Sequence, residues 1–477
     1  MALAILLLPL ILAGVALLVP SNRARPWLLP VAGVGHLSLV GAALGRLPLG
    51  SPTGWLVLDP LGGLVLALIS VLFFLCSLYA VGYLRHREDR SNRVFCACLL
   101  VFLAMMSLVT WAHHWGLMWV AMEATTLASA PLIYFNRTAR SLEATWKYLL
   151  ICSVGIALAL LGSFFLAYSS LHEGLPSSLL MEDLLRNAPK LSTPWLRAAF
   201  VLLLVGYGTK MGLAPMHSWK PDAYGESPGV AGALFSGGMT SCALLMVLRI
   251  YHVCHAAGEA DVARQMMVFM GLVSMAVAAA FLIRQRDLKR MLAYSSVEHM
   301  GILVLGVGIG GPALYGALLH MVNNGLAKGV LFLSAGNIHR AYGGKSLDEV
   351  SGALRRLPLS GALFLAGFLA ITGSPPFGPF LSEFTIARAA LGGGQFLAGG
   401  LFLALLFAVF VGMGATVLAA TQGRPSEEAL ATSYRDGWLT GGPTLVMMAM
   451  VLMLGVHLPV FLRTLLLDAV RFLEARP

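Results

Sequence analysis

The chain has 477 residues, of which 58% are hydrophobic and 11% carry a formal charge. Because about a quarter of the residues in a soluble domain are charged, this composition excludes a soluble enzyme of this length, and it also excludes a disordered or fibrous chain. The 32 basic and 22 acidic residues leave a net charge of +10. The basic residues lie in short stretches between apolar runs, so we attribute them to orientation in a membrane and not to nucleic-acid binding.

Fourteen apolar runs are long enough for a helix that crosses the hydrocarbon, which takes about 20 residues. We therefore predict an all-α, multi-pass membrane protein with about fourteen transmembrane helices. The predicted spans are 2–20, 27–48, 61–84, 94–112, 115–135, 146–171, 198–218, 229–256, 263–283, 291–310, 312–338, 357–387, 395–421 and 441–466. The first run lacks a basic stretch before it and a cleavage site after it, so we expect a true span and not a removed signal peptide.

The loops on the two sides of this predicted bundle differ in charge. Numbered from the N-terminus, the odd loops hold 20 of the Lys and Arg residues, whereas the even loops and the C-terminal tail hold 10. Since basic loops tend to stay in the cytoplasm, we expect the odd loops to face the cytoplasm and both termini to face outward.

Ionisable residues lie inside several of the apolar runs, among them two carboxylic acids and two lysines. Glu123, Lys210, Lys328 and Glu383 each fall within a predicted span. A charge at the centre of a bilayer costs ~2.5–3.5 kcal/mol even on the mildest scale, and such residues usually face the bundle interior and mark an ion or proton path. We take these four positions as the primary candidates for function.

Lys328 also completes a polar stripe with His320 and Asn324 at spacing i, i+4, i+8, about 12 Å long at the rise of an α-helix. A lone intramembrane His is often a satisfied packing residue, but three polar groups on one face favour a proton path. Glu123 has a simpler alternative, a neutral carboxyl that is hydrogen-bonded to Thr125 or Thr126.

Two of the predicted spans contain helix-breaking residues. Lys210 lies five residues before Pro215, and Glu383 lies four residues after Pro379, in a stretch with two further prolines. Proline removes a backbone donor, and in lipid the freed carbonyls must meet protein or water, so broken helices line cavities. We predict that spans seven and twelve are interrupted near the middle of the membrane.

Paired broken helices in the two halves of a chain are typical of inverted-repeat transporters. We therefore predict four parts. Residues 1–93 form helices one to three, 94–256 form a first repeat of five helices, 257–421 form a second, inverted repeat, and 422–477 contain the last helix.

Other candidate sites are weaker. His113 with His114, and His252 with His255, could bind a metal, but both pairs lie at predicted outward helix ends, where exposure to water accounts for them. The six cysteines fit no disulfide, haem or iron–sulfur spacing. No nucleophile–base pair, phosphate loop or metal triad occurs, so we predict no metal and no cofactor in this chain.

Three stretches resemble the antiporter-like membrane subunits of respiratory complex I and of the Mrp antiporters. The stretch 210–224, KMGLAPMHSWKPDAY, resembles the broken seventh helix of that family. The stretch 287–301, DLKRMLAYSSVEHMG, resembles its ninth-to-tenth-helix signature, and 320–337 resembles its helix eleven. Together these motifs are highly specific.

The resemblance covers roughly residues 55–390. Within it, residues 142–156 and the pair Glu298–His299 are most similar to the large membrane subunits of hydrogenase-4 and formate hydrogenlyase-type complexes. The resemblance thus implies a membrane subunit that moves protons.

It also implies roles for individual residues. Glu123 would modulate Lys210, the proton-binding lysine of the seventh helix, so we predict that their side chains approach within salt-bridge or one-water distance in at least one state. His320 and Lys328 would form the relay of the eleventh helix, and Glu383 would be the terminal carrier on the twelfth. Further residues would relay protons or hold water, namely His217, Thr240, Ser241, His299, Asn323 and Asn324.

Two positions depart from the family pattern. The eighth helix of the family usually carries a lysine or histidine eight residues before an arginine, and here Ser241 stands eight residues before Arg249. Asn324 stands where many members have a second histidine. Neither Ser nor Asn can hold a proton as a charge, so the centre of the relay would need water or a direct transfer over a longer gap.

From these observations we expect a proton-translocating subunit of a redox-driven complex in a prokaryotic inner membrane. A partner hydrophilic arm with iron–sulfur clusters, and in one version a nickel–iron site, would supply the energy together with other membrane subunits. Coupling would be electrostatic, through the effect of Glu123 on Lys210. The alternatives are a cation/proton antiporter subunit powered by an ion gradient and a membrane scaffold that conducts nothing.

Overall fold

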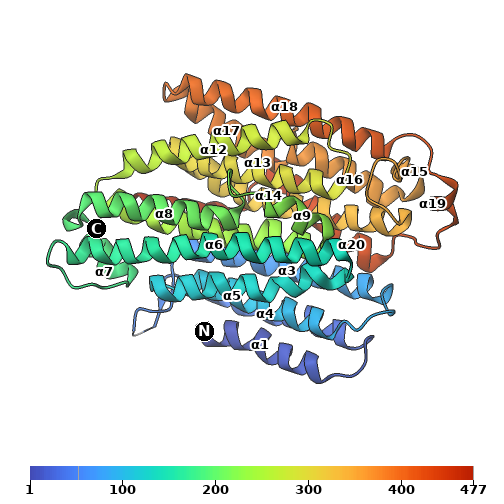
Figure 1. The fold of residues 1–477 in the computed structure, drawn as a ribbon, viewed down its shortest axis with the longest axis horizontal. Coiled ribbons are helices and arrows are strands. Elements are labelled where there is room, and N and C mark those ends of the chain that lie inside the picture. Colours follow the sequence, from blue (N-terminus) through green and yellow to red (C-terminus); the bar gives the residue numbers. More distant parts are fainter. Residues whose placement is uncertain (52, 476–477) are drawn as a thin grey trace.

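The computed structural model describes residues 1–51 and 53–475 and is almost entirely helical. The long helices run roughly parallel to one another across the view of Figure 1, from α1 at the bottom to α18 at the top. The main helices are α1 (Ala2–Leu18), α2 (Leu28–Leu44), α3 (Pro60–Arg85), α4 (Arg93–Trp111), α5 (Trp115–Ile133), α6 (Ala139–Leu171), α7 (Met181–Arg186), α8 (Thr193–Met211), α9 (Trp219–Glu226), α10 (Gly229–Leu234), α11 (Thr240–Ala256), α12 (Ala260–Leu282), α13 (Leu288–Ile309), α14 (Pro312–Tyr342), α15 (Ala353–Arg356), α16 (Pro358–Ile371), α17 (Gly378–Gly392), α18 (Phe396–Thr421), α19 (Glu427–Ala431), α20 (Trp438–Val456) and α21 (Val460–Glu474).

Ten helices in the described part of the chain are long and apolar enough to cross a membrane, and two shorter helices, α1 and α16, are also apolar. The fold is thus that of an all-helical, multi-pass membrane protein, as predicted. All fourteen predicted runs fall on a helix or a broken helix, but the number that crosses the membrane, the inverted repeats and the four-part division stay predictions. A hairpin of two short strands, β1 (Leu49–Gly50) and β2 (Val57–Leu58), joins α2 to α3.

The last predicted span, 441–466, is wrong as a single helix. Helix α20 ends at Val456 and α21 begins at Val460. His457 and Pro459 lie between them, and proline at this position cannot continue the preceding helix. Helix α21 packs against α3, α11 and α14.

The two predicted helix breaks are confirmed. Helix α8 ends at Met211, and Gly212 follows with a φ of 79°, a left-handed conformation that glycine adopts without strain. Helix α9 begins only at Trp219. In the second break, α16 ends at Ile371 and α17 begins at Gly378.

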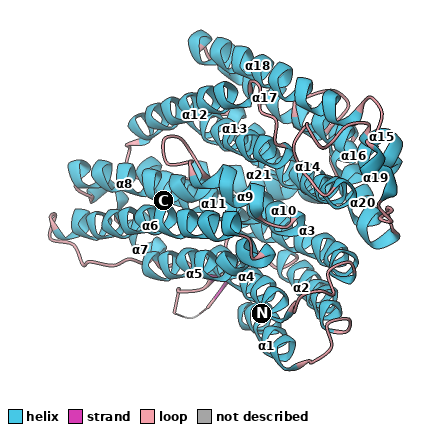
Figure 2. Ribbon diagram, turned by 45° about the vertical axis from the view of Figure 1, so that its right-hand side comes forward, coloured by secondary structure: helices cyan, strands magenta, loops and turns pink. Residues whose placement is uncertain are grey.

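Two helical segments form the centre of the bundle. Every residue is buried from 316 to 338 in α14, and from 229 to 256 in the continuous segment of α10 and α11. Peripheral helices instead expose large apolar side chains, as Leu150 and Phe164 do on α6 and Phe396 and Phe407 on α18. Figure 2 shows α14 and α11 enclosed between the outer helices. The central polar residues are therefore shielded by a full layer of protein.

The segment of α10 and α11 contains a wider turn. Residues Phe235–Met239 form one turn of π-helix between the two α-helices. Such turns are rare and are often found at functional sites. Here the π turn lies beside the broken helix α8, because the Sδ atom of Met239 is 3.7 Å from the Nζ atom of Lys210.

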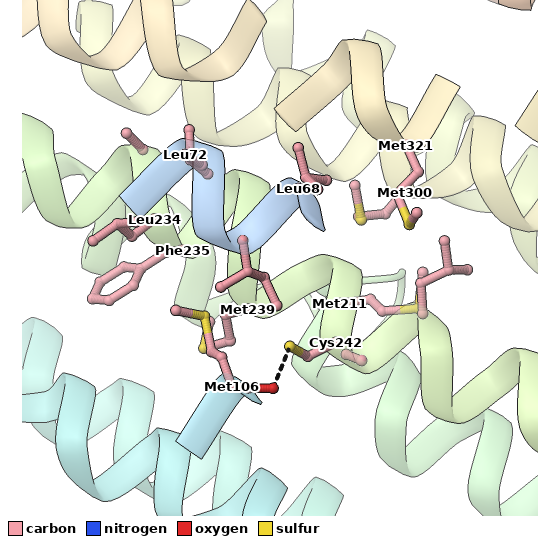
Figure 3. Packing of buried hydrophobic residues seen from close by; sticks show 14 of the residues in the cluster. Leu68, Leu72, Met106, Met211, Leu234, Phe235, Met239, Cys242, Met300 and Met321 are labelled. Carbon is pink, nitrogen blue, oxygen red and sulfur yellow. Dashed lines mark hydrogen bonds between the residues drawn. The ribbon is translucent and has the colours of Figure 1, made fainter. Parts of the chain in front are cut away.

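Sulfur-containing side chains fill the space around this turn. Figure 3 shows Met106, Met239 and Cys242 packed together, with Leu68 and Leu72 of α3 above them. The Cys242 thiol lies 3.7 Å from the backbone carbonyl of Met106. Methionine is flexible and fills irregular gaps, so this part of the core can adapt to small movements of the helices around it.

Candidate functional site

Lys210 lies in the last turn of α8, directly before the first helix break. Its side chain is completely buried. The Nζ atom donates a hydrogen bond to the Tyr148 hydroxyl at 3.0 Å and lies 4.9 Å from the centre of that ring. A buried ammonium is stabilised by such a cation–π contact and by the hydroxyl dipole. Tyr148, on α6, is thus the main polar partner of Lys210.

Glu123 approaches the same tyrosine from α5 and is half-buried. It accepts a hydrogen bond from Thr126 at 3.0 Å, which is the local interaction expected from the sequence as the simpler alternative. Ser129, one turn further along α5, bonds the Tyr148 hydroxyl at 2.6 Å. Among the described residues Glu123 and Lys210 form no direct ion pair, so their direct approach in another state stays a prediction. The two are linked through α5 hydroxyls and Tyr148.

Side chains satisfy the backbone carbonyls freed by the first break. Trp219 Nε1 donates to the carbonyl of Thr209 at 2.9 Å, and Lys220 Nζ donates to the carbonyl of Met211 at 2.5 Å. Since the last carbonyls of a helix have no partner within it, these bonds allow α8 to end inside the protein. The break is therefore a stable feature of the fold.

Lys328 lies on the central helix α14 and is completely buried. Its Nζ atom donates to the hydroxyl of Ser295 at 2.7 Å and to the backbone carbonyl of Leu292 at 3.3 Å, both on α13. The described residues place no carboxylate in an ion pair with it. An ammonium held only by neutral oxygens can give up its proton without breaking an ion pair.

Two turns before Lys328, His320 connects α13, α14 and α17. Its Nε2 atom is 2.9 Å from Nδ1 of His299, and its Nδ1 atom is 2.9 Å from the hydroxyl of Ser382. A carboxylate oxygen of Glu298 lies 3.8 Å from Nε2 of His299. His299, His320 and Glu383 each offer one atom that could bind a metal, and these three atoms lie within 4.8 Å of one another. The structure therefore joins the eleventh- and twelfth-helix candidates in one buried cluster.

Several polar atoms of this cluster have no hydrogen-bond partner within the described residues. They belong to the side chains of Glu298, His299, Asn323, Asn324 and Glu383. Buried polar atoms in proteins are nearly always paired with protein groups or with ordered water, so these atoms are candidates for contact with water.

The same three side chains are the kind that could hold a metal ion. Two imidazoles and a carboxylate suit Zn²⁺. The two facing ring nitrogens, however, are already hydrogen-bonded to each other. A metal would have to break that bond, so the observed arrangement fits a proton path better than a metal site.

The remaining predicted candidates lie apart from this cluster. The hydroxyls of Thr240 and Ser241 donate to the carbonyls of Ser236 and Gly237 at 2.6 Å each, at the π turn. His217 lies in the first break, half-buried, with Nδ1 3.2 Å from the carbonyl of Pro215. The structure therefore does not bring His217 together with Lys210 or Lys328.

A separate ionic cluster lies at the opposite end of α11. Asp59 caps α3, and its carboxylate is 2.7 Å from His113 and 3.3 Å from Arg249. Burial raises the pKa of the Asp59 carboxyl, but Arg249 and His113 outweigh this effect and hold that pKa below its usual value. The expectation that water exposure accounts for His113 is wrong, since this side chain is only 10% exposed and is paired with Asp59. His252 is buried as well.

A polar cavity of about 460 Å³ lies where α6, α9 and α13 meet. Lys147 pairs with Asp222 at 2.9 Å on its wall, and Lys345 pairs with Glu226 at 2.8 Å. Arg290 also pairs with Asp222. In the predicted orientation this is the cytoplasmic side, and the cavity reaches α9 on the side of the first break.

Three residues of the buried path are not evident from the sequence. Tyr148 carries no charge and resembles any aromatic residue of a span. Glu298 lies beside a predicted candidate and serves there only as a mark of resemblance. Lys220 looks like a loop lysine, but it is completely buried. Its signal is its position two residues beyond the predicted broken span and five residues after Pro215.

We predict that Tyr148→Phe slows transport about tenfold without loss of the subunit. The substitution removes the hydroxyl that joins Lys210 to Ser129, and a hydrogen bond to a charged group contributes about 1.5–3 kcal/mol. The measurement is ion uptake into vesicles by the assembled complex. Tyr207→Phe is the matched control, since that hydroxyl is also buried but has no partner within the described residues. Equal rates for the two variants would contradict a role for the Tyr148 hydroxyl.

Comparisons with known proteins identify a family and several similar chains. Residues 112–412 match the family described as NADH:quinone oxidoreductase/Mrp antiporter, TM. The chain is 34% identical over 433 residues to a hydrogenase-4 component F homolog of Methylacidiphilum infernorum, covering 88% of this chain and 89% of that protein. It is also 34% identical over 370 residues to NADH-quinone oxidoreductase subunit N of Desulforudis audaxviator, covering 76% and 72%.

Solved structures show the same fold at lower identity. A chain of the Mrp complex from Dietzia sp. superposes with a TM-score of 0.86 at 20% identity, covering 99% of this chain and 97% of that one. A chain of respiratory complex I from Thermus thermophilus superposes with a TM-score of 0.80 at 24% identity, covering 98% and 99%.

Proposed function

The chain belongs to the NADH:quinone oxidoreductase/Mrp antiporter family of membrane subunits, and from this premise we propose that it translocates protons within a redox-driven complex. The observation that carries the proposal is the buried series of ionisable side chains on the central helix α14 and on the two broken helices. Lys210 and Lys328 are each completely buried without an ion-paired carboxylate among the described residues. Burying such groups in a membrane costs free energy, and buried ionisable residues of membrane proteins usually serve transport or another function.

In this proposal protons enter from the polar cavity beside α9 and reach Lys210, whose charge responds to Glu123 through Tyr148. They move on to Lys328 and then to the cluster of His320 and Glu383. Glu383 is the terminal carrier, and the water-binding groups of α11 and α14 support transfer between the charged positions. The two helix breaks support a division into the inverted repeats 94–256 and 257–421.

The redox partner is proposed from the relatives. One relative at 34% identity is a hydrogenase-4 component F homolog, and another is a subunit of NADH-quinone oxidoreductase. We therefore propose that the chain works with other membrane subunits in a prokaryotic inner membrane. A hydrophilic arm with iron–sulfur clusters would drive the transport from the cytoplasmic side. In a hydrogenase complex this arm would also hold a nickel–iron site. This chain would then carry no redox cofactor of its own.

A role in cation/proton antiport is the second candidate. It is favoured by the 29% identity, over 342 residues, to one component of the Na(+)/H(+) antiporter of Alkalihalophilus pseudofirmus. That match covers 41% of the relative, so it supports a shared core more than a shared complex. A non-conducting scaffold would leave the cost of the buried charges unexplained.

One experiment separates these functions. The native complex is purified through a tag on this chain, its subunits are identified, and it is reconstituted into vesicles. We expect redox subunits to co-purify and protons to move when electron donor and acceptor are added. Proton movement driven only by a sodium gradient would select the antiporter, and assembly without any proton movement would select the scaffold.

A further inference from the structure

We propose that Lys220 is a further proton carrier, which receives a proton that leaves Lys210 and passes it to Lys328. The inference rests on the proposed function, because it adds a residue to the same path. Lys220 lies on α9, directly after the first helix break, and its side chain is completely buried.

The contacts of Lys220 are those of a group that can lose its charge. Its Nζ atom donates to two backbone carbonyls, that of Met211 at 2.5 Å and that of Ser296 at 3.3 Å, and it lies 5.6 Å from the centre of the Tyr224 ring. No ion pair joins it to a carboxylate within the described residues. A buried charge without a counter-charge is expensive, whereas a neutral amine in the same place still donates hydrogen bonds to carbonyls.

Its two carbonyl partners place Lys220 between the two lysines of the proposed path. Met211 directly follows Lys210 in α8. Ser296 directly follows Ser295, the residue whose hydroxyl accepts a hydrogen bond from Lys328. The amine of Lys220 therefore bonds the residue next to Lys210 on one side and, on the other, the residue next to Ser295, the hydrogen-bond partner of Lys328.

The surroundings of Lys220 supply a reason for the proton to move on. The charged and titratable groups that face it from other parts of the described chain are Lys328 on α14, His299 on α13, Cys152 on α6 and His217 in the break. The ammonium groups of Lys220 and Lys328 repel each other, so protonation of one lysine favours release of a proton from the other. In the transfer itself, an N–H bond breaks at Lys210 and forms at Lys220, then breaks there and forms at Lys328, and no electron is exchanged.

The backbone leaves room for this side chain. A Cβ atom at Gly212 would lie 2.5 Å from Cδ of Lys220 and 3.0 Å from its Nζ atom. Glycine at the break thus permits both the turn and the passage of the lysine stem. The next acidic residue of α9, Asp222, lines the polar cavity, so the helix that carries Lys220 also extends to the proposed entrance.

Lys220 could also have a purely structural role, because its amine bonds the carbonyl of Met211 at the end of α8. The experiment must therefore distinguish this role from proton transfer. The matched variants are Lys220→His and Lys220→Gln in the intact complex. Both can donate a hydrogen bond over a similar reach, but only histidine takes up a proton. We expect His to retain measurable redox-driven proton uptake and Gln to lose it about a hundredfold, the lower end of what a positioned proton carrier contributes.

Two further variants make the outcome decisive. Lys289→Gln is the control, since Lys289 is also a buried lysine that donates to a backbone carbonyl, that of Ser227, and it should transport normally. If the Gln variant does not assemble, Lys220→Arg decides, because arginine keeps the charge and the donors but does not release its proton. An assembled Arg variant should be inactive.

The results also separate this inference from the proposed function. Normal proton uptake by assembled Lys220→Gln or Lys220→Arg, equal rates for His and Gln, or loss of assembly in all three variants would overturn the role of Lys220. In each of these cases the unmodified complex would still pump protons. Absence of proton uptake by the unmodified complex would instead overturn the proposed function itself.

Discussion

Lys328→Met is expected to abolish redox-driven proton translocation while the complex remains assembled. Methionine keeps the length of the side chain and removes the charge, and Lys328 is completely buried on the central helix with its Nζ atom on Ser295 and Leu292. Removal of a buried charge also removes its desolvation cost, so the fold should tolerate the change. The measurement is proton uptake in vesicles, with assembly followed in parallel.

Ser241→Ala is the control for this variant. The Ser241 hydroxyl donates to the carbonyl of Gly237 within its own helix, so its loss should slow transport much less than loss of the lysine. Undiminished pumping by an assembled Lys328→Met complex would remove this residue from the path and favour a scaffold.

Arg249→Met should destabilise the fold by about 3–5 kcal/mol, as expected when one partner of a buried ion pair is removed. The guanidinium bonds the carboxylate of Asp59 at 3.3 Å and the carbonyls at the C-terminal end of α4. Without it, the Asp59 charge is left with His113 alone, and three carbonyls lose their donor. The measurement is the temperature at which the heated complex releases this subunit.

The double variant Asp59→Asn/Arg249→Met tests the cause. It also removes the stranded carboxylate, so it should be more stable than Arg249→Met alone. The alternative is that Asp59→Asn lowers the stability of the Arg249→Met variant as much as it lowers that of the unmodified chain. The two side chains would then act independently, and loss of the ion pair would not explain the destabilisation by Arg249→Met.

The sequence predicted the features that depart from an uncharged and uninterrupted transmembrane helix. Charges inside apolar runs predicted the burial of Lys210, Lys328 and Glu383, and prolines predicted both helix breaks. These predictions succeed because a lipid environment penalises charge and unpaired carbonyls so strongly that each exception needs a partner. Glu123 shows the limit of the rule, because it is only half-buried and bonds Thr126 within its own helix.

Other parts of the site depend on how the chain returns on itself. Lys220 lies between Trp219 and Pro221 in a polar stretch, and only the fold of the break brings its amine to the carbonyl of Met211 inside the protein. The pairing of His299 with His320, and of His320 with Ser382, joins residues from three helices. No spacing within one helix can predict such contacts. The end of the last span was misplaced because residues 457–459 interrupt the helix without a change in overall hydropathy.

The π turn at Phe235–Met239 has a consequence for motion. It holds one residue more than an α-helical turn would, so the side chains after it are rotated by about 100° relative to an uninterrupted α-helix. If the surplus residue migrates along the helix, the segment between its old and new positions turns about its axis while both ends stay in place. Met239, now 3.7 Å from the amine of Lys210, would swing away from it, and the path could open and close without any displacement of the outer helices.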